Sequence, residues 1–340
     1  MSPTVQAISF RVILSCVLAF AAGGALAQTS IDDVHITPRD NTGDVATSAY
    51  AANSASGPHM GGGIVRTSVN LVLVPVTITD AFHRPVVGLD QDNFQLFEGK
   101  KAQEIKSFSS EDLPVSLGIL VDTSGSMSYK LERAREAVIQ FCEAANPQDE
   151  FFMITFADVP QLTTDFTTST ERVENDLLTA RSKGRTSLLD AIYMGIRNMR
   201  KARYARKALL ILSDGGDNHS RYTEHDVKSV IKESDVTIYA VGTYDRYAAT
   251  EEELMGPELL RSVAGLTGGQ AFTITNANEM SAVTRNIGTQ LRHQYMLAYQ
   301  PQAPPQDGKW HKISVKLRLP KKLNYLLHIE ARPGYYGGGE

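Results

Sequence analysis

The sequence VSLGILVDTSGSM, over residues 115–127, decides the fold of this chain. Its first part is a largely apolar run of the length of a β-strand, and small polar residues follow at once. A strand that is apolar on both faces is typical of a parallel sheet that helices cover on both sides. In such a sheet the ligand site lies outside the carboxyl ends of the strands, so the side chains after Val121 are predicted to lie at a functional edge.

Further strand and helix patterns alternate after this stretch. Three more short apolar segments have the strand pattern, and amphipathic segments with helical spacing separate them. Strands that alternate with helices predict an open, doubly wound, mostly parallel α/β sheet, and we place this domain at residues 113–294. The predicted strands cover residues 115–121, 151–156, 208–212 and 236–241, and the predicted helices cover residues 130–145, 188–203, 225–233, 257–264 and 279–293.

Strand patterns also flank this domain on both sides. Residues 72–79 alternate in part between apolar and polar side chains, and the turn at 98–101 separates two strand-like segments, which indicates a hairpin. Residues 295–299 and 312–319 again have strand character, but neither flank has enough strands for a stable sheet. We therefore predict that the two flanks pair as a small β-sandwich into which the α/β domain is inserted. The predicted segments are residues 64–112, residues 295–336 and a tail at 337–340.

The N-terminus has the pattern of an export signal. Arg11 precedes an apolar run, and Ala25-Leu26-Ala27 supplies the small residues that a signal peptidase accepts. We predict a signal peptide at residues 1–27, cleaved before Gln28, and a flexible polar linker at 28–63. No stretch reaches the roughly 20 apolar residues that a transmembrane helix needs. The mature protein is therefore predicted to be secreted or periplasmic, with no membrane span after cleavage.

Composition narrows the class of partner. The chain has 340 residues and a formal net charge of −4, and it contains no long run of Lys and Arg. The basic group between Arg200 and Lys207 is interpreted as the solvated end of a helix, so no nucleic-acid partner is predicted. Once the signal peptide is removed, Cys142 is the only cysteine, which excludes an internal disulfide.

Oxygen-bearing side chains follow the ends of two predicted strands. Asp122, Ser124 and Ser126 alternate in one tight loop, and Asp214 follows the end of another strand. Thr186, at the start of a helix, adds a third hydroxyl. Because the carboxyl ends of parallel strands meet at one edge, these side chains are expected to lie close together. Hard cations such as Mg²⁺ take oxygen ligands, so the sequence predicts a metal site formed by these five residues.

This set of an Asp-x-Ser-x-Ser loop, a separate Thr and a separate Asp resembles the metal-ion-dependent adhesion site of the von Willebrand factor A family. The resemblance covers the whole α/β domain and rests on three motifs in order. It implies that Ser124, Ser126 and Thr186 contact the cation through their hydroxyls. It implies that Asp122 and Asp214 coordinate the cation directly or through water. The cation would be Mg²⁺, or Mn²⁺ or Ca²⁺ in its place, with an open position for an acidic residue of a protein partner.

The flanking strands extend the resemblance. Residues 94–108, 295–299, 310–313 and 332–336 resemble the corresponding parts of the von Willebrand factor A-related family that is abundant in Acidobacteria. For that family the resemblance runs from residue 64 to residue 336, and it implies an architecture more than a role.

Structural interpretations stay open for the individual residues. The two serines could cap the helix that follows them, and Thr186 and Asp214 could be ordinary turn residues. Asp190 and Asp217 could support the ligands by hydrogen bonds, or could stabilise a helix and a solvated loop. Arg185 could meet an acidic partner at the edge of the site or lie in solvent. All the structural interpretations of the five ligands would have to coincide in one topology, which favours the metal site.

Three classes of function follow from such a site. The leading hypothesis is a binding module that recognises a protein partner through the cation. The alternative is a structural subunit of a cell-envelope assembly, in which the metal only stabilises the edge of the sheet. A metal-dependent hydrolase is disfavoured, because the chain has no Gly-x-Ser-x-Gly elbow, no Gly-rich phosphate loop with Lys, and no Asp-x-Asp pair at Asp122. No catalytic residue is therefore predicted.

Overall fold

The computed structural model of this chain describes residues 71–244, 251–301, 307–319 and 327–337. The chain divides into two compact units after residue 64, and all of the described residues belong to the second unit. The predicted signal peptide and linker lie outside the described residues. Among the helices of the described residues, none is long and apolar enough to cross a membrane.

The central sheet has the strand order β10-β9-β8-β5-β6-β7. Each neighbouring pair is parallel except β6 and β7, which are antiparallel. This open, mostly parallel sheet confirms the predicted α/β fold class. Its strands are β5 (Ser116–Asp122), β6 (Glu150–Phe156), β7 (Pro160–Thr167), β8 (Lys207–Ser213), β9 (Thr237–Thr243) and β10 (Ala271–Ile274).

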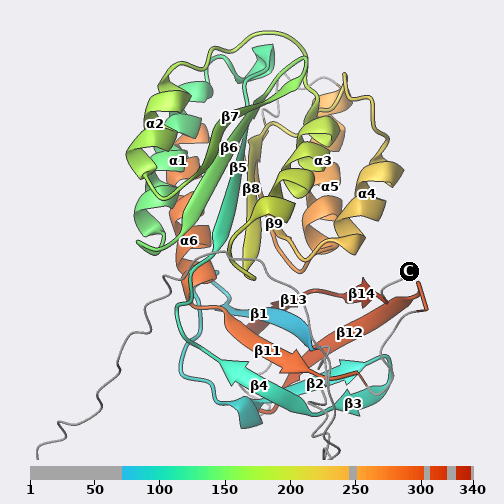
Figure 1. Cartoon of the computed structure of the whole chain (residues 1–340). Helices are drawn as coiled ribbons and strands as arrows, with labels where there is room; N and C mark the ends of the chain where they lie inside the picture. Colours follow the sequence, from blue (N-terminus) through green and yellow to red (C-terminus); the bar gives the residue numbers. More distant parts are fainter. Residues whose placement is uncertain (1–70, 245–250, 302–306, 320–326, 338–340) are drawn as a thin grey trace, which may run out of the picture. The chain divides into compact units, whose positions relative to one another are not determined.

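Alternate side chains of β5 enter two separate cores, which explains why the strand is apolar on both faces. Leu117, Ile119 and Val121 pack with α1, α2 and α6, whereas Leu120 packs with α3, α4 and α5. Figure 1 shows these two groups of helices on opposite faces of the sheet. Full burial of such a side chain contributes about 2 kcal/mol, so the strand is held from both faces. The helices are α1 (Leu131–Ala144), α2 (Thr170–Leu178), α3 (Leu188–Asn198), α4 (Glu224–Glu233), α5 (Glu251–Gly265) and α6 (Met280–Arg292).

Three elements of this domain are not predicted by the sequence patterns, namely β7, β10 and α2. β7 and β10 are the two edge strands of the sheet, so each pairs on one side only. α2 buries only Val173 and Leu177 among its described side chains. Edge strands and short helices bury few side chains, and their hydrophobic patterns are correspondingly weak. The helix predicted at 188–203 ends earlier, at Asn198, and a 3-10 turn follows at Met199–Lys201.

Strands from both sides of the α/β domain pair in two antiparallel sheets, as predicted. The strand orders are β13-β1-β11-β4 and β14-β12-β2-β3. Val76 of β1 lies opposite Tyr295 and Ala331, and Leu96 of β2 lies opposite Val315. Buried side chains from both sheets form one shared core, which makes the two sheets a β-sandwich. The strands are β1 (Val72–Asp80), β2 (Phe94–Glu98), β3 (Lys101–Gln103), β4 (Ile105–Ser109), β11 (Tyr295–Tyr299), β12 (Trp310–Leu317), β13 (Leu327–Ala331) and β14 (Gly334–Tyr336).

Side-chain hydrogen bonds connect this sandwich with the α/β domain. Asn286 and Gln290, both on α6, donate from their amide groups to the backbone carbonyl of His83, at 3.0 and 3.1 Å. Gln270 donates from Nε2 to Oε1 of Glu330 on β13. Since buried polar groups need such partners, these bonds fix the contact between the two parts of the described unit.

Candidate functional site

The last residue of β5 is held by both of its carboxylate oxygens. Oδ1 of Asp122 accepts a hydrogen bond from the backbone N–H of Ser124 at 2.8 Å, and Oδ2 accepts one from the hydroxyl of Ser213 at 2.6 Å. Ser213 ends β8, the neighbouring parallel strand, and Asp122 is fully buried. The carboxylate is therefore fixed between two strand ends. Ser213 is a partner that the sequence analysis did not identify.

The loop after β5 brings two of the predicted hydroxyls together. Oγ of Ser124 lies 3.0 Å from Oγ of Ser126, and Ser124 is buried. Between them, the N–H of Gly125 donates to the carbonyl of Gly184 at 2.9 Å, which ties this loop to the segment that carries Thr186. Ser124 precedes a 3-10 helix at Gly125–Met127 without capping it by its side chain, and the N-cap of α1 is a lysine. The capping interpretation therefore fails for Ser124 at these helix starts.

Backbone hydrogen bonds hold Thr186 against the loop that follows β8. Its N–H donates to Oδ1 of Asn218 at 2.9 Å, and its carbonyl accepts from the N–H groups of Asn218 and His219, at 3.1 and 3.0 Å. Thr186 is buried. The loops that carry Thr186 and Asp214 are thus joined directly.

A sharp turn positions Asp214. The residue follows β8 and is buried, and the next residue, Gly215, has a φ of +81°. A Cβ on Gly215 would lie 2.8 Å from the backbone of Gly256 on α5. Only glycine tolerates both the positive φ and this close approach, so the turn after Asp214 depends on it.

A buried lysine that the sequence analysis did not single out lies beside Asp214. Nζ of Lys130 is 3.5 Å from Oδ2 of Asp214, and the two side chains are 5% and 2% exposed. The ammonium also lies over the ring of Tyr129, 5.3 Å from its centroid. The one signal in the sequence was the position of Lys130 at the start of the helix predicted over 130–145, shortly after the serines; in the structure Lys130 is the N-cap of α1. Its charge neutralises one of the two buried carboxylates of the site.

The electrostatics of the site follow from these two carboxylates and one ammonium. Burial and then the charge of Asp214 raise the pKa of Asp122 from its ordinary 3.8 to about 7. The hydrogen bonds from Ser124 and Ser213 lower the pKa but are outweighed. Above this pH the described site carries an excess of buried negative charge. Such a charge is costly without a further cation.

Two other acidic residues hold loops rather than the predicted ligands. Oδ1 of Asp217 accepts from the N–H of Leu189 at 3.2 Å and from the hydroxyl of Ser220 at 2.6 Å. Oδ1 of Asp190 accepts from the N–H of Arg221 at 2.9 Å. These bonds join the loop after β8 to the start of α3, which is the structural interpretation of both residues. Within the described residues, neither carboxylate bonds to a side chain of the five predicted ligands.

Arg185 lies at the surface next to Thr186. Its Nη2 is 3.0 Å from Nε2 of His219, and its Nε is 3.5 Å from Oδ1 of Asp158. The side chain is still 62% exposed. The exposed side chain matches a solvated loop residue, and contact of Arg185 with an acidic partner stays a prediction.

The five predicted ligands come from three loops that contact one another at the carboxyl edge of the sheet. They offer two carboxylates and three hydroxyls, and this all-oxygen set fits a hard cation such as Mg²⁺. Among the described residues, no group of three or more His, Cys, Asp or Glu is placed to hold a metal. The candidate centre is of a different kind, since hydroxyls supply most of its donors.

One sequence comparison identifies the central part of the chain. Residues 117–216 match the family model of the von Willebrand factor type A domain. The matched segment runs from β5 to the turn after β8 and contains all five predicted ligands. No curated protein matches the chain.

Solved structures are similar to the chain in fold. A von Willebrand factor type A protein from Catenulispora acidiphila is 15% identical, with a TM-score of 0.48, over 80% of this chain and 64% of that one. An aerotolerance-related membrane protein from Bacteroides fragilis is 17% identical, with a TM-score of 0.43, over 52% of this chain and 98% of that one. The von Willebrand factor domain of the type V pili tip protein Mfa5 from Porphyromonas gingivalis is 14% identical, with a TM-score of 0.43, over 52% and 94%.

Proposed function

We propose, from the premise that this chain contains a von Willebrand factor type A domain, that the domain binds one divalent cation and, through it, a protein partner. The cation is Mg²⁺, or Mn²⁺ or Ca²⁺ in its place. Its ligands are Asp122, Ser124, Ser126, Thr186 and Asp214.

The buried negative charge is the observation that supports this proposal. Asp122 and Asp214 are both buried, and the charge of Asp214 raises the pKa of Asp122. Lys130, at 3.5 Å from Asp214, supplies one positive charge. One buried carboxylate is then left without a positive partner, and a divalent cation would compensate the charge that Lys130 does not.

The surrounding groups prepare these side chains for a cation. The hydrogen bonds from Ser124 N–H and Ser213 Oγ hold the Asp122 carboxylate in one orientation, so little rearrangement is needed. Three of the five ligands are neutral hydroxyls, so a bound divalent cation together with Lys130 would outweigh the two carboxylates by one positive charge. A bound cation of this kind supplies a position that attracts a carboxylate. The exposed guanidinium of Arg185, beside Thr186, adds to the attraction for an acidic partner.

We extend the proposal to an exported protein without catalytic activity of its own. The signal pattern at residues 1–27 supports export, and the missing hydrolase motifs support a binding role. The structural-subunit alternative differs in one respect, because its metal would stabilise the domain without affecting any partner.

Isothermal titration of the metal-free chain with Mg²⁺ tests the cation site. We expect binding of one ion, and we expect Ser124→Ala to weaken it at least about tenfold, the effect of about 1.4 kcal/mol. Ser128→Ala is the matched control, because this exposed hydroxyl of the same loop donates to the carbonyl of Gly125 and is not a proposed ligand. Equal affinity in all three proteins would reject the site.

Partner capture from the native envelope, with Mg²⁺ or with EDTA, tests the second half of the proposal. We expect a partner that is retained with Mg²⁺ and lost both in EDTA and with the Ser124→Ala protein. A partner retained in EDTA, together with a lower unfolding temperature, would favour the structural subunit. Metal-dependent turnover of phosphate or ester substrates would favour a hydrolase.

A further inference from the structure

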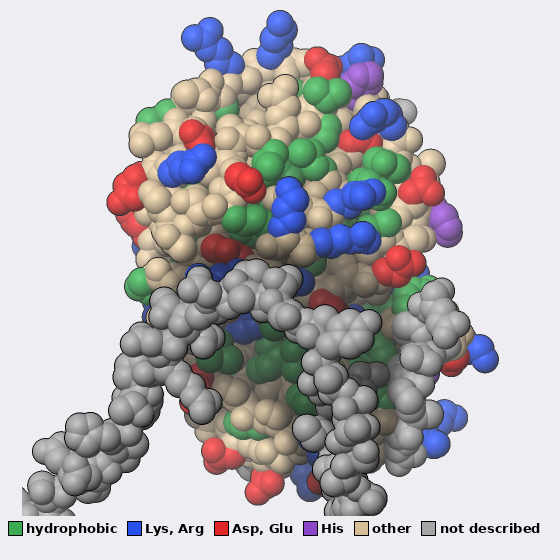
Figure 2. Space-filling view, in the orientation of Figure 1, with side chains coloured by type: hydrophobic (Ala, Val, Ile, Leu, Met, Phe, Trp, Pro, Cys, Tyr) green, Lys and Arg blue, Asp and Glu red, His purple; other side chains and the backbone are tan. Residues whose placement is uncertain are grey.

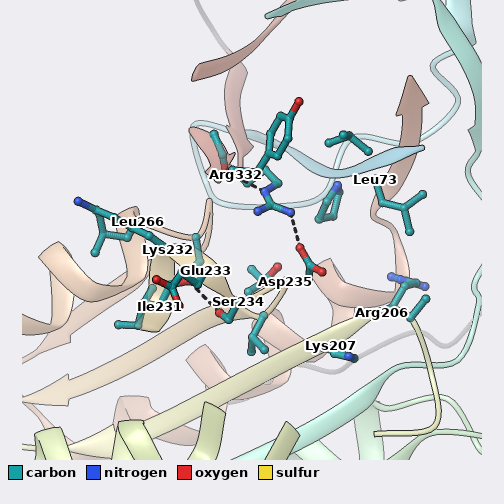
Figure 3. Close-up of a pocket in the computed structure, with 18 of the residues that line it drawn as sticks. Leu73, Arg206, Lys207, Ile231, Lys232, Glu233, Ser234, Asp235, Leu266 and Arg332 are labelled. Carbon is teal, nitrogen blue, oxygen red and sulfur yellow. Dashed lines mark hydrogen bonds and ion pairs between the residues drawn. The ribbon is translucent and has the colours of Figure 1, made fainter. Parts of the chain in front are cut away.

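A second candidate site lies far along the sheet from the metal ligands. A cavity of about 500 Å³ is lined by the first residues of β8 and β9 and by residues of β1, β11 and β14 in the sandwich (Figure 3). Lys207 stands at the start of β8 and lines the cavity, whereas Ser213 and Asp214 stand at the opposite end of that strand. Cavities of this volume at the meeting of two structural parts are typical of small-molecule sites.

Apolar side chains form much of the wall. Leu73 of β1 is 40% exposed although it belongs to a paired strand, and it lines the cavity together with Leu266 and Ile231 from the α/β domain. Exposing an apolar side chain such as Leu73 to water is unfavourable, and an apolar ligand would cover it.

The charged groups of the cavity are unequal in number. The described residues that line it include four cations and two carboxylates. Nη1 of Arg332 binds Oδ1 of Asp235 at 2.7 Å, and Arg206 donates to the carbonyls of Leu113 and Leu291. Lys207 forms no ion pair with any described residue. An anion would therefore find an uncompensated ammonium at this wall.

Figure 3 separates two sides of the cavity. The Arg332–Asp235 pair spans its middle, with Leu73 and Arg206 on one side of the view, Ile231, Lys232 and Leu266 on the other, and Lys207 below the pair. The lining thus combines the apolar surface of Leu73 with Lys207, which has no ion pair among the described residues.

A smaller cavity shares part of its lining with the first and is also lined by charged and apolar side chains. It measures about 170 Å³, and both cavities are lined by Lys207, Glu233, Ser234, Asp235 and Val236. It adds Arg200, an exposed cation from the basic group noted in the sequence, and apolar residues of α3 and α4. Figure 2 shows Lys and Arg side chains interspersed with hydrophobic ones on the α/β part of this face.

We propose that the larger cavity binds a single-chain amphiphile with an anionic head group, of the class of aliphatic carboxylates. The alkyl chain packs against Leu73, and the carboxylate accepts hydrogen bonds from the ammonium of Lys207. An alkyl cation should bind more weakly, because the excess of positive charge in the cavity would repel it. A short carboxylate such as acetate should also bind more weakly, because it would leave the apolar wall exposed to water. The site is independent of the proposed cation site, because it lies at the amino-terminal ends of the strands.

Calorimetry with the full chain and dodecanoate tests this proposal, with dodecyltrimethylammonium and acetate as probes that lack the negative charge or the alkyl chain. We expect dodecanoate to bind at least about tenfold more tightly than either of the other two, the effect of one well-placed charge-assisted contact or a few buried methylenes. Equal binding of dodecanoate and dodecyltrimethylammonium would overturn the proposal. So would the absence of dodecanoate binding at about 1 mM, a concentration at which even a weak ligand binds.

Two substitutions locate the binding, and one serves as control. Lys207→Gln is expected to weaken dodecanoate binding about tenfold, and Leu73→Ser several-fold, through the lost charge and the lost apolar contact. Lys201→Gln changes an exposed cation of the same basic group that lines neither cavity, and it should leave the affinity within about twofold. An unchanged thermal unfolding midpoint confirms folding of each variant. Unchanged dodecanoate affinity of the Lys207→Gln protein would reject the amphiphile site. An octaglutamate peptide, which carries negative charge but no alkyl chain, would also reject it if it bound more tightly than dodecanoate in a competition experiment.

Discussion

Replacing Asp122 by Asn is expected to stabilise the metal-free protein and to abolish its response to Mg²⁺. The carboxylate is fully buried, and its hydrogen bonds come from Ser124 N–H and Ser213 Oγ. An asparagine keeps the acceptor for the N–H and can donate to the serine oxygen, so the local geometry survives. The substitution therefore removes mainly a buried negative charge.

The size of the effect follows from the pKa of Asp122. Burial and the charge of Asp214 raise this pKa from 3.8 to about 7, a difference of roughly three pH units at about 1.4 kcal/mol each. Because the folded protein holds the proton more tightly than the unfolded chain, its stability falls as pH rises from about 4 to about 7. At pH 8 the ionised carboxylate then costs the folded protein about 4 kcal/mol. Since the amide forms weaker hydrogen bonds, we expect Asp122→Asn to raise the free energy of unfolding by about 2 to 4 kcal/mol.

Urea unfolding at pH 8, followed by far-UV circular dichroism with EDTA or with Mg²⁺, measures this effect. The one tryptophan, Trp310, belongs to the sandwich strand β12, so its fluorescence would report on the wrong part of the chain. With Mg²⁺ at a hundred times its Kd, the wild type should gain about 2.7 kcal/mol and Asp122→Asn nothing. Asp165→Asn, an exposed carboxylate on β7, is the control and should match the wild type. An Asn variant that is less stable than the wild type in EDTA, and that Mg²⁺ still stabilises, would refute the reasoning.

Three further changes test other parts of the structure. Burial raises the pKa of Glu330 to about 7, so this group should lower the free energy of unfolding of the wild type by up to about 3 kcal/mol between pH 4.5 and pH 7. Glu330→Gln should remove that loss, which urea titrations at pH 5 and pH 8 measure. Lys130→Met leaves Asp214 without its ammonium, so the metal-free protein should lose about 3 kcal/mol of its free energy of unfolding. Calorimetry should show that this variant binds Mg²⁺ at least about tenfold more tightly, and unchanged Mg²⁺ affinity would contradict the prediction. Gly215→Ala forces a side chain into a positive φ and into the backbone of α5, at a cost of about 2 kcal/mol in chemical unfolding, whereas Gly265→Ala, with open space around it, should change stability by less than about 1 kcal/mol.

The candidate ligands could be predicted from the sequence because each lies at the end of a strand or the start of a helix whose hydrophobic pattern is visible in the sequence. Asp122 ends a largely apolar strand and Ser124 follows it closely, and the topology of parallel sheets places such residues at one edge whatever the rest of the chain does. Asp214 follows β8 in the same way. Their common location is thus a consequence of strand direction, which the alternation of strands and helices already implies.

The roles of Lys130 and Ser213 could not be predicted from the sequence in the same way. A lysine before a helix is normally solvated, and it is buried here because its loop contacts the end of β8, a strand distant in the sequence. The hydroxyl of Ser213 becomes a partner of Asp122 only once β5 and β8 lie side by side. Both contacts change the charge balance of the site, and both depend on pairing between remote segments.

The sequence by itself determined the class of the central sheet, the pairing of the two flanks and the chemical types at its carboxyl edge. Hydrophobic periodicity reports which residues are buried, and burial specifies strands and helices locally. Only the tertiary structure decided the edge strands β7 and β10, the Lys130–Asp214 pair and the cavity beside Leu73 and Lys207. Edge strands bury too little to leave a strong pattern, and ion pairs and cavities arise from surfaces that meet across long sequence separations. No local pattern records such meetings, which is why the cavity beside Leu73 became visible only in the folded chain.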